Sequence, residues 1–255
     1  DISDPRTVTQ FANLVGSLER LRLLYILTAA DIRAVGPGVW NAWKGQQMAD
    51  LYHNTAAALR GGRADESGVQ AHLEARAEAR RESVVEELGS IPHTLLEMET
   101  AYWTGFDVPD LTWHATALKE GGSVVCYRFP PEGGALTLMV CGEDRPGLFA
   151  DLAGTLANLG ANVVSAQVFT NRSGRILDIF ILQDGSQQPY GLKDASRLQR
   201  LETALEQTLS GTSVKEPAAA RMGRREAAFL VQPSAQIRND VSTEYTVVDI
   251  AGRDR

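Results

Sequence analysis

Apolar and polar residues follow one pattern in the first half of this chain and another in the second. Up to Leu118, apolar residues recur at every third or fourth position, which is the spacing of helices with one buried face. From Ser123 onward, short apolar runs suited to strands alternate with turns rich in glycine and proline. The pattern predicts an α+β fold with an all-helical N-terminal half.

The helical half divides into two parts. The pair Asp4-Pro5 predicts the start of the first helix, because a capping side chain followed by proline suits a helix N-terminus. The segment 18–34 is apolar on most sides, and we expect it at the centre of a helical core. The segment 69–88 is charged with a few apolar positions, which is typical of an exposed helix packed through one edge. We therefore expect one part over residues 1–62 and a helical arm or linker over residues 63–120.

The second half begins with a predicted strand over residues 124–129, which is followed by a unit that starts with a strand, a turn and a helix. Residues 136–141 form an apolar run, the turn GEDRPG follows, and four leucines spaced along residues 148–159 give the next helix an apolar stripe. Two further strands over 162–169 and 175–183 are joined by the hairpin turn NRSG. A helix from Asp194 and a last strand within 229–239 complete the order β-α-β-β-α-β, which is the ferredoxin-like unit.

The strand and turn recur near the end of the sequence. Aligning Asp254-Arg255 with Asp144-Arg145 superposes the strand YTVVDIA on the strand at 136–141, and the two motifs lie 110 residues apart. This spacing is that of a repeated domain. We expect the first unit over residues 121–240 and the start of a second unit over residues 241–255.

Composition narrows the classes of function. The formal net charge of −7 argues against a surface for nucleic acid or an anionic membrane, and no apolar run approaches the roughly 20 residues of a membrane span. The two cysteines, Cys126 and Cys141, lie in apolar runs without metal-site spacing, which indicates buried thiols in a reducing cytoplasm. No signal peptide is visible, and the four histidines are scattered singly, so they predict no metal centre.

The turn at 142–147 is a candidate anion site. Gly147 lets a ligand approach the main chain, and the free N–H groups of the following helix start attract a carboxylate. The alternative is a strand–helix corner that binds nothing.

A βαββαβ unit whose first turn reads DRPGLF, with GAN before its second strand, resembles the ACT domain, a small module that binds amino acids. The resemblance implies that the ligand lies where the turn faces the start of the second strand, often across a domain interface. The implied contacts are Asp144, Arg145, Pro146, Gly147, Leu148, Phe149, Asn162 and Val163.

These implied contacts have separate roles. Backbone N–H groups from Gly147 to Phe149 would hold the α-carboxylate, and Asp144 or a main-chain carbonyl would hold the α-ammonium. Asn162 would reach a side-chain amide. The alternatives are a helix cap for Asp144 and a solvated charge for Arg145.

The block LYILTAADIRAVGPGVWNAWK at 24–44 is similar to the end of the HD domain in the family of bifunctional PII uridylyltransferase/uridylyl-removing enzymes. Members of that family end in two ACT domains, which agrees with the repeat. The resemblance implies a nucleotidyltransferase domain that moves UMP from UTP to the nitrogen-regulatory protein PII. It also implies an HD domain that removes UMP with Mg²⁺ or Mn²⁺, and an ACT pair that senses glutamine. The ACT region itself requires no cofactor.

Two signatures of that family do not occur in the sequence: a Gly-Ser motif with paired aspartates, and a His…His-Asp cluster. We therefore expect no catalytic residue here and neither activity from these residues alone. The resemblance implies that Asp31 is the last metal-ligating aspartate of the HD domain. A carboxylate on an apolar helix is costly unless it is paired or bound to metal. The alternative is a partnership with a nearby arginine such as Arg33 or with a helix N-terminus.

Two other readings stay open: an ACT regulatory module of another enzyme, and a non-catalytic ACT regulator. If the resemblance to the PII uridylyltransferase/uridylyl-removing enzymes holds, we expect ligand binding to reposition the helical arm at 69–118 and so to favour removal of UMP over its transfer.

Overall fold

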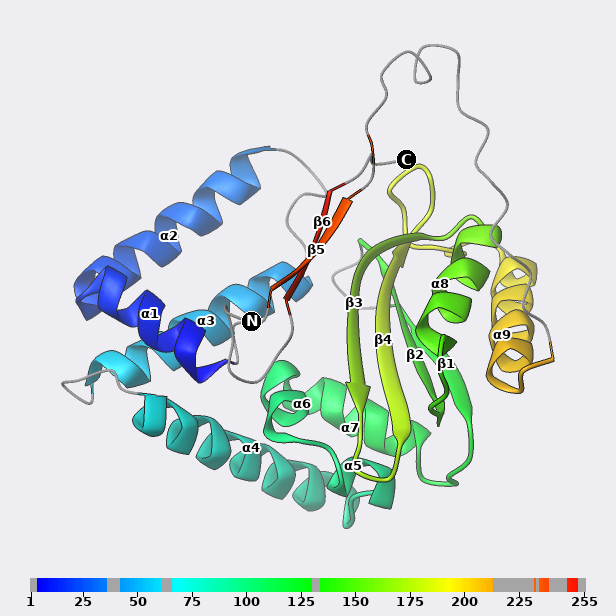
Figure 1. Cartoon of the computed structure of the whole chain (residues 1–255), viewed down its shortest axis with the longest axis horizontal. Coiled ribbons are helices and arrows are strands. Elements are labelled where there is room, and N and C mark those ends of the chain that lie inside the picture. The colour runs from blue at the N-terminus through cyan, green and yellow to red at the C-terminus, as the bar shows by residue number, and fades with distance from the viewer. Residues whose placement is uncertain are drawn as a thin grey trace.

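The computed structural model describes residues 4–35, 42–60, 66–129, 134–212, 232, 234–238 and 247–251, and all structural statements below concern these residues. Figure 1 shows helices in the first half of the chain and an antiparallel sheet with two further helices in the second. The predicted α+β class with a helical N-terminal half is confirmed. The repeated Gly252, Asp254 and Arg255 lie outside the described residues.

Three helices open the chain: α1 (Pro5–Val15), α2 (Leu18–Val35) and α3 (Ala42–Arg60). The predicted start at Asp4-Pro5 is confirmed, because Asp4 caps α1 by accepting hydrogen bonds from the Arg6 backbone N–H at 3.2 Å and the Thr7 hydroxyl at 2.9 Å. Gly16 ends α1 in the left-handed conformation that favours glycine.

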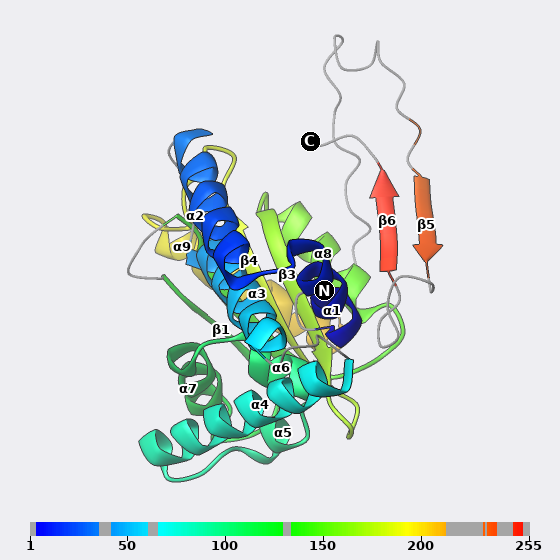
Figure 2. The same cartoon turned by 90° about the vertical axis from the view of Figure 1, so that its left-hand side faces the viewer.

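The helix α2 was expected at the centre of a helical core, and this expectation is wrong for the described residues. Only Leu21 of α2 is buried, whereas Leu23, Ile26 and Leu27 are each more than half exposed. An apolar helix is buried only where neighbours cover all of its sides. Here α1 and α3 cover one side, and the opposite side faces solvent (Figure 2).

A long helix, α4 (Glu66–Leu88), connects the first three helices, α1 to α3, which we call the front helices, to the rest of the molecule. Its predicted single packed edge is confirmed, with Val69, Leu73, Ala77 and Val84 all buried. Three short helices follow: α5 (His93–Leu96), α6 (Thr100–Gly105) and α7 (Val108–Ala117).

The sheet contains β1 (Val124–Arg128), β2 (Leu136–Glu143), β3 (Asn162–Thr170) and β4 (Arg175–Gln183) in the spatial order β1-β2-β4-β3. Every neighbouring pair is antiparallel. The helix α8 (Leu148–Asn158) connects β2 to β3, and α9 (Ala195–Leu209) follows β4.

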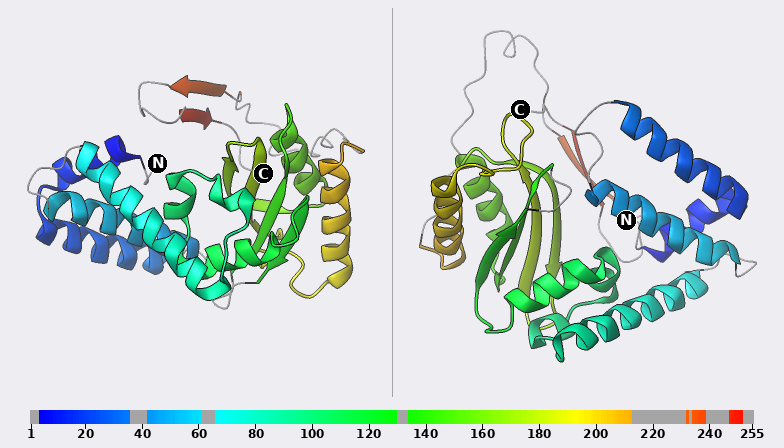
Figure 3. Two further views of the ribbon diagram at one scale, coloured as in Figure 1. Left: turned by 90° about the horizontal axis from the view of Figure 1, so that it is seen from below. Right: turned by 180° about the vertical axis from the view of Figure 1, so that it is seen from behind.

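Helices cover both faces of this sheet. Side chains alternate between the faces along each strand, and both faces carry apolar side chains that the helices bury. Leu138 and Phe180 pack beneath α8 and α9, while Met139 and Leu177 pack against α4, α6 and α7. Figure 3 shows α9 on the side of the sheet away from α4. The predicted helical arm is therefore one layer of the same core as the sheet.

The last strand was expected within 229–239 as the sixth element of the unit, and here the structure differs. Its described part, β5 (Ser234–Arg238), pairs with β6 (Val247–Ala251) in a separate two-stranded sheet (Figure 2). The position beside β2 is filled by β1 instead. An apolar run predicts a strand, but it does not determine which partner the strand pairs with.

The two-stranded sheet repeats the first hairpin in its register. Val124 pairs with Cys141 in the first hairpin, and Ser234 pairs with Ala251 in the second. Each residue of the second pair lies 110 residues after its counterpart in the first (124 to 234, 141 to 251). The repeated unit therefore includes β1, which lies within the range 121–240 expected for the first unit, and β5 corresponds to β1 in the second unit.

No helix in the described part of the chain is both long enough and apolar enough to cross a membrane.

Candidate functional site

The turn between β2 and α8 holds most of the predicted ligand contacts. The Asp144 backbone N–H donates to the Gly174 carbonyl oxygen at 2.9 Å, so this turn lies beside the β3–β4 hairpin. Gly147 precedes α8 with φ +81°, which a side chain would strain. A Cβ built there would have no neighbour within 4 Å, so the main chain of this turn is open to a ligand.

Arg145 has structural partners on both helices of this layer. Its Nη1 lies 2.6 Å from the Asp151 carboxylate on α8, and its Nη2 donates to the Thr208 carbonyl oxygen on α9 at 3.2 Å. A cation near the last carbonyl groups of α9 also suits the negative end of that helix. Arg145 thus links α8 to α9 through its side chain, and the alternative prediction of a solvated charge does not describe it.

The first residues of α8 divide between core and surface. Leu148 is buried in the core beneath α8. Phe149 is 45% exposed and stacks on the buried Phe180 of β4, with ring centroids 6.0 Å apart. Asp144, Pro146, Gly147 and Phe149 are therefore the predicted turn contacts that a ligand could reach.

Asn162 and Val163 do not lie near this turn. They begin β3 and pair with Gln183 and Leu182, at the end of the sheet where β2 starts. The turn follows Glu143 at the other end of β2. At about 3.3 Å per residue, the two groups are separated by roughly 25 Å. One unit therefore cannot bring both groups to one amino acid, and a shared site would require two units.

A carboxyl group that the sequence analysis did not select lies in β4. Asp178 is 1% exposed, and its Oδ1 has no hydrogen-bond partner among the described residues. Burial raises its pKa to about 7, the Phe169 backbone N–H opposes this shift, and the charge of Asp144 adds to it. The signal in the sequence was a single acid inside the apolar run RILDIFILQ.

Asp31, the predicted metal ligand, is exposed on α2. The argument that its carboxylate must be paired because the helix is buried therefore does not hold in this structure. The described residues contain no group of three or more His, Cys, Asp or Glu side chains placed to hold a metal ion. A metal role for Asp31 stays a prediction.

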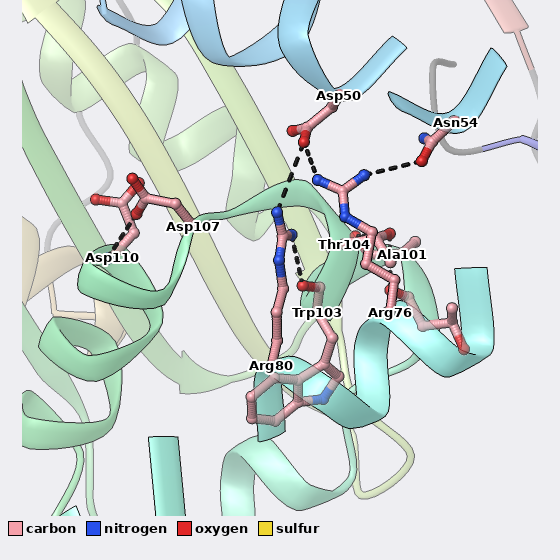
Figure 4. A network of polar contacts seen from close by, with 10 residues as sticks. Asp50, Asn54, Arg76, Arg80, Ala101, Trp103, Thr104, Asp107 and Asp110 are labelled. Carbon is pink, nitrogen blue, oxygen red and sulfur yellow. Dashed lines mark hydrogen bonds and ion pairs between the residues drawn. The ribbon is translucent and has the colours of Figure 1, made fainter. Parts of the chain in front are cut away.

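A polar network joins the front helices to the helices packed on the sheet (Figure 4). The buried Asp50 carboxylate on α3 pairs with Arg76 of α4 and lies 3.6 Å from Nη2 of Arg80, one turn further along α4. Arg76 also donates to Asn54 at 2.8 Å, and Arg80 donates to the Trp103 carbonyl oxygen of α6 at 2.9 Å. One carboxylate thus links α3 and, through Arg80, α6 to the same face of α4.

Arg80 keeps its charge at neutral pH. Burial lowers the pKa of Arg80 to about 10 and the nearby Arg76 charge adds to this effect, while Asp50 opposes it. Arg80 therefore stays protonated near pH 7. Removing its anionic partner would leave two guanidinium groups in a site that is mostly shielded from water.

Comparison with protein families identifies the second half of the chain. Residues 136–207 match the family described as the ACT domain. This part of the chain is an ACT domain. It covers β2 to α9, and its first turn is the open turn described above. A comparison with solved structures gave no match.

Curated relatives are similar to the whole chain. Proteins from Caulobacter vibrioides, Phenylobacterium zucineum and Gluconobacter oxydans are 44%, 43% and 36% identical to it over its full length. Each bears the name bifunctional uridylyltransferase/uridylyl-removing enzyme, and the chain spans 28% of the length of each. The resemblance to ACT domains and to bifunctional uridylyltransferase/uridylyl-removing enzymes is confirmed, and the likeness of the block at 24–44 to an HD domain stays a prediction.

Proposed function

We propose that this chain is the glutamine-sensing regulatory region of an enzyme that adds UMP to the protein PII and removes it again. The observation that carries the proposal is an ACT domain within a chain that is similar along its whole length to relatives bearing both activities in their name. This similarity favours the proposal over an ACT module of another enzyme or a free-standing regulator.

In this proposal the chemistry belongs to parts of the enzyme beyond these residues. The chain spans 28% of its relatives, and its described residues contain no group that could hold a metal. UTP, PII and the Mg²⁺ or Mn²⁺ needed for transfer and hydrolysis would be bound elsewhere, with Asp31 as the one candidate ligand from this chain. Glutamine is the effector, and location in the cytoplasm stays a prediction.

Glutamine would bind at the open turn before α8. The Leu148 backbone N–H donates to the Arg145 carbonyl oxygen at 3.1 Å, so the α-carboxylate would bind the neighbouring main chain of Gly147 and Phe149, where the positive end of α8 favours an anion. Because Asn162 lies at the other end of the sheet, its contact with a ligand amide requires a second unit. The hairpin β5–β6, which repeats β1–β2 in register, supports the presence of such a unit.

The helix α4 would transmit the effect of binding to the front helices. Ala77 and Val84 of α4 share a core with Met139 and Leu177 of the sheet. At its other end, α4 packs through Val69 and Leu73 against α1 and α3. The Asp50 network adds a polar connection between α3 and α4. A shift of the ACT sheet would therefore reach the region similar to the HD domain through one helix.

The proposal is tested on the intact enzyme by calorimetric titration with L-glutamine, L-glutamate and L-asparagine, together with rates of UMP transfer and removal. We expect selective binding of glutamine, a lower rate of transfer and a higher rate of removal. Absence of binding by any of the three amino acids would contradict the proposal.

A pair of glycine variants places the site. Gly147→Val and Gly89→Val both add a β-branched side chain at φ near +80° in open space, so each should cost about 1–2 kcal/mol of stability. Only Gly147→Val would obstruct the turn, and we expect at least a tenfold loss of glutamine affinity from it alone. Equal affinities in the two variants would move the site away from this turn.

A further inference from the structure

Asp178 is unusual among the carboxyl groups of the described chain because it lies within a buried strand. Its neighbours across the sheet are Val168 on β3 and Val140 on β2, and Val140 is fully buried. The side chain is 1% exposed, and its Oδ1 accepts no hydrogen bond from the described residues. A buried polar atom without a partner is costly, so such a group points to a ligand or another function.

The carboxyl group lies on the face of the sheet that α8 covers. Ile176 and Phe180, each two residues from Asp178, belong to the core beneath α8 and α9, whereas Leu177 and Ile179 face the opposite layer. Strand alternation therefore places Asp178 with Ile176 and Phe180. Phe149, in the first turn of α8, stacks on Phe180 at 6.0 Å. Asp178 thus lies beneath the start of α8.

Two arginines at this end of the sheet pair with other acids, and a third, Arg172, is exposed in the turn of the β3–β4 hairpin. Arg145 pairs with Asp151 at 2.6 Å, and Arg175 pairs with Glu143 at 2.6 Å. Asp144, in the adjacent turn, adds a second negative charge that raises the pKa of Asp178, although burial is the larger cause. The local charge therefore favours a cationic ligand near Asp178.

The surroundings of Asp178 are apolar and partly open. The sheet ends at β3, the edge strand next to β4 (Figure 1). Val168, directly opposite Asp178 on β3, is 48% exposed, and Phe149 is 45% exposed. An acid between exposed apolar side chains, beneath a helix start that favours an anion, matches an amino acid: an ammonium, an aliphatic carbon and a carboxylate within one small molecule.

We propose that Asp178 binds the α-ammonium group of the amino-acid effector, while the first turn of α8 binds its α-carboxylate. This inference rests on the proposed function and assigns to Asp178 the role that the resemblance to ACT domains implied for Asp144 or a main-chain carbonyl. Asp144 lies in the exposed turn, where water competes for its carboxylate. Asp178 is shielded from water, so its pairing with an ammonium group is stronger.

The test separates the ammonium contact from the rest of the ligand. The intact enzyme is titrated with L-glutamine and with glutaramic acid, which is glutamine without its α-amino group. The variants are Asp178→Asn and Glu143→Gln, where Glu143→Gln removes a carboxylate at the same end of the sheet that is exposed and paired with Arg175. We expect Asp178→Asn to weaken glutamine binding by about 10- to 100-fold and to leave glutaramic acid binding unchanged. Glu143→Gln should change neither affinity appreciably.

Three results would overturn the inference in distinguishable ways. Equal glutamine affinity in Asp178→Asn and the unchanged protein would remove Asp178 from the site while leaving the proposed function intact. An equal loss for glutamine and glutaramic acid would make Asp178 a structural residue. Absence of glutamine binding by the unchanged protein would overturn both the inference and the proposed function.

If the Asp178→Asn variant does not fold, the pH dependence of ligand affinity in the unchanged protein tests the same contact. An ammonium group pairs with the ionised carboxylate, so the affinity of the unchanged protein for glutamine should rise between pH 6 and pH 8. The affinity for glutaramic acid should not rise over the same range. Parallel pH profiles for the two ligands would contradict a contact between Asp178 and the ammonium group.

Discussion

Replacing Asp178 by asparagine should change the way in which the unfolding free energy of the chain depends on pH. The side chain keeps its size and stays polar, but it can no longer ionise. In the folded chain, burial raises the pKa of this carboxyl from 3.8 to about 7. In the unfolded chain it ionises near its ordinary value. The folded state therefore holds a proton that the unfolded state has lost between these two pH values.

The sign and size of the effect follow from this difference. Below pH 3.8 both states are protonated, and the contribution of Asp178 to stability is fully present. As pH rises toward 7, the unfolded state is favoured by ionisation, so the unfolding free energy of the unchanged chain falls. At about 1.36 kcal/mol per pKa unit, a shift of roughly three units corresponds to ~4 kcal/mol. The asparagine variant lacks this loss.

Urea unfolding of both chains between pH 4 and pH 8, followed by tryptophan fluorescence, measures the effect. Trp103 is fully buried in the core beside α4 and reports unfolding of that layer. The difference in unfolding free energy between variant and unchanged chain should grow by a few kcal/mol between pH 4 and pH 8, and Glu143→Gln should show no such growth. Parallel curves for Asp178→Asn and the unchanged chain would refute the account of a buried carboxyl group whose pKa is raised.

Two further predictions concern the layer that carries α4. Burial lowers the pKa of His114 to about 3, and its Nδ1 lies 3.0 Å from the Tyr102 hydroxyl. The unfolding free energy should therefore be highest above pH 6.5 and fall by ~5 kcal/mol toward pH 3. The urea midpoint of a His114→Gln variant should lack that fall. An acid dependence equal to that of the unchanged chain would contradict the burial of a neutral His114. Asp50→Ala leaves Arg76 and Arg80 without their shared anion and should lower the unfolding free energy by about 3–5 kcal/mol; a loss below about 1 kcal/mol in urea unfolding would show that water replaces the carboxylate.

Much of the fold follows from local sequence signals. The capped start at Asp4-Pro5, the strand–turn–helix around Gly147 and the single packed edge of α4 depend on residues close together in the chain, so their patterns predicted them. The burial of α2 depends instead on what surrounds it. A pattern that is apolar on most sides does not say which elements cover the helix. Among the described residues, α1 and α3 cover one side of α2, and only Leu21 is buried.

The candidate site was predicted in part. The open main chain at Gly147 followed from the turn residues, but the structural roles of Arg145 and Leu148 depend on contacts with α9 and the core that the sequence does not encode locally. Asp178 was overlooked because an acid inside an apolar strand has no motif of its own. Only the three-dimensional structure shows that the carboxyl group lies beneath α8 with its Oδ1 unpaired among the described residues.

The register of the second hairpin bears directly on how the site is completed. Because β5–β6 repeats β1–β2 with the same spacing, the repeated unit begins with the edge strand, and β5 belongs to its own sheet rather than to the first. The first unit therefore has its open turn and Asp178 near one end of the sheet and Asn162 at the other. Two such units placed side by side in opposite directions would bring the turn of one to the strand start of the other. Variants of Gly147 and Asn162 in the same unit should then each weaken glutamine binding at a different site, rather than both at the same site.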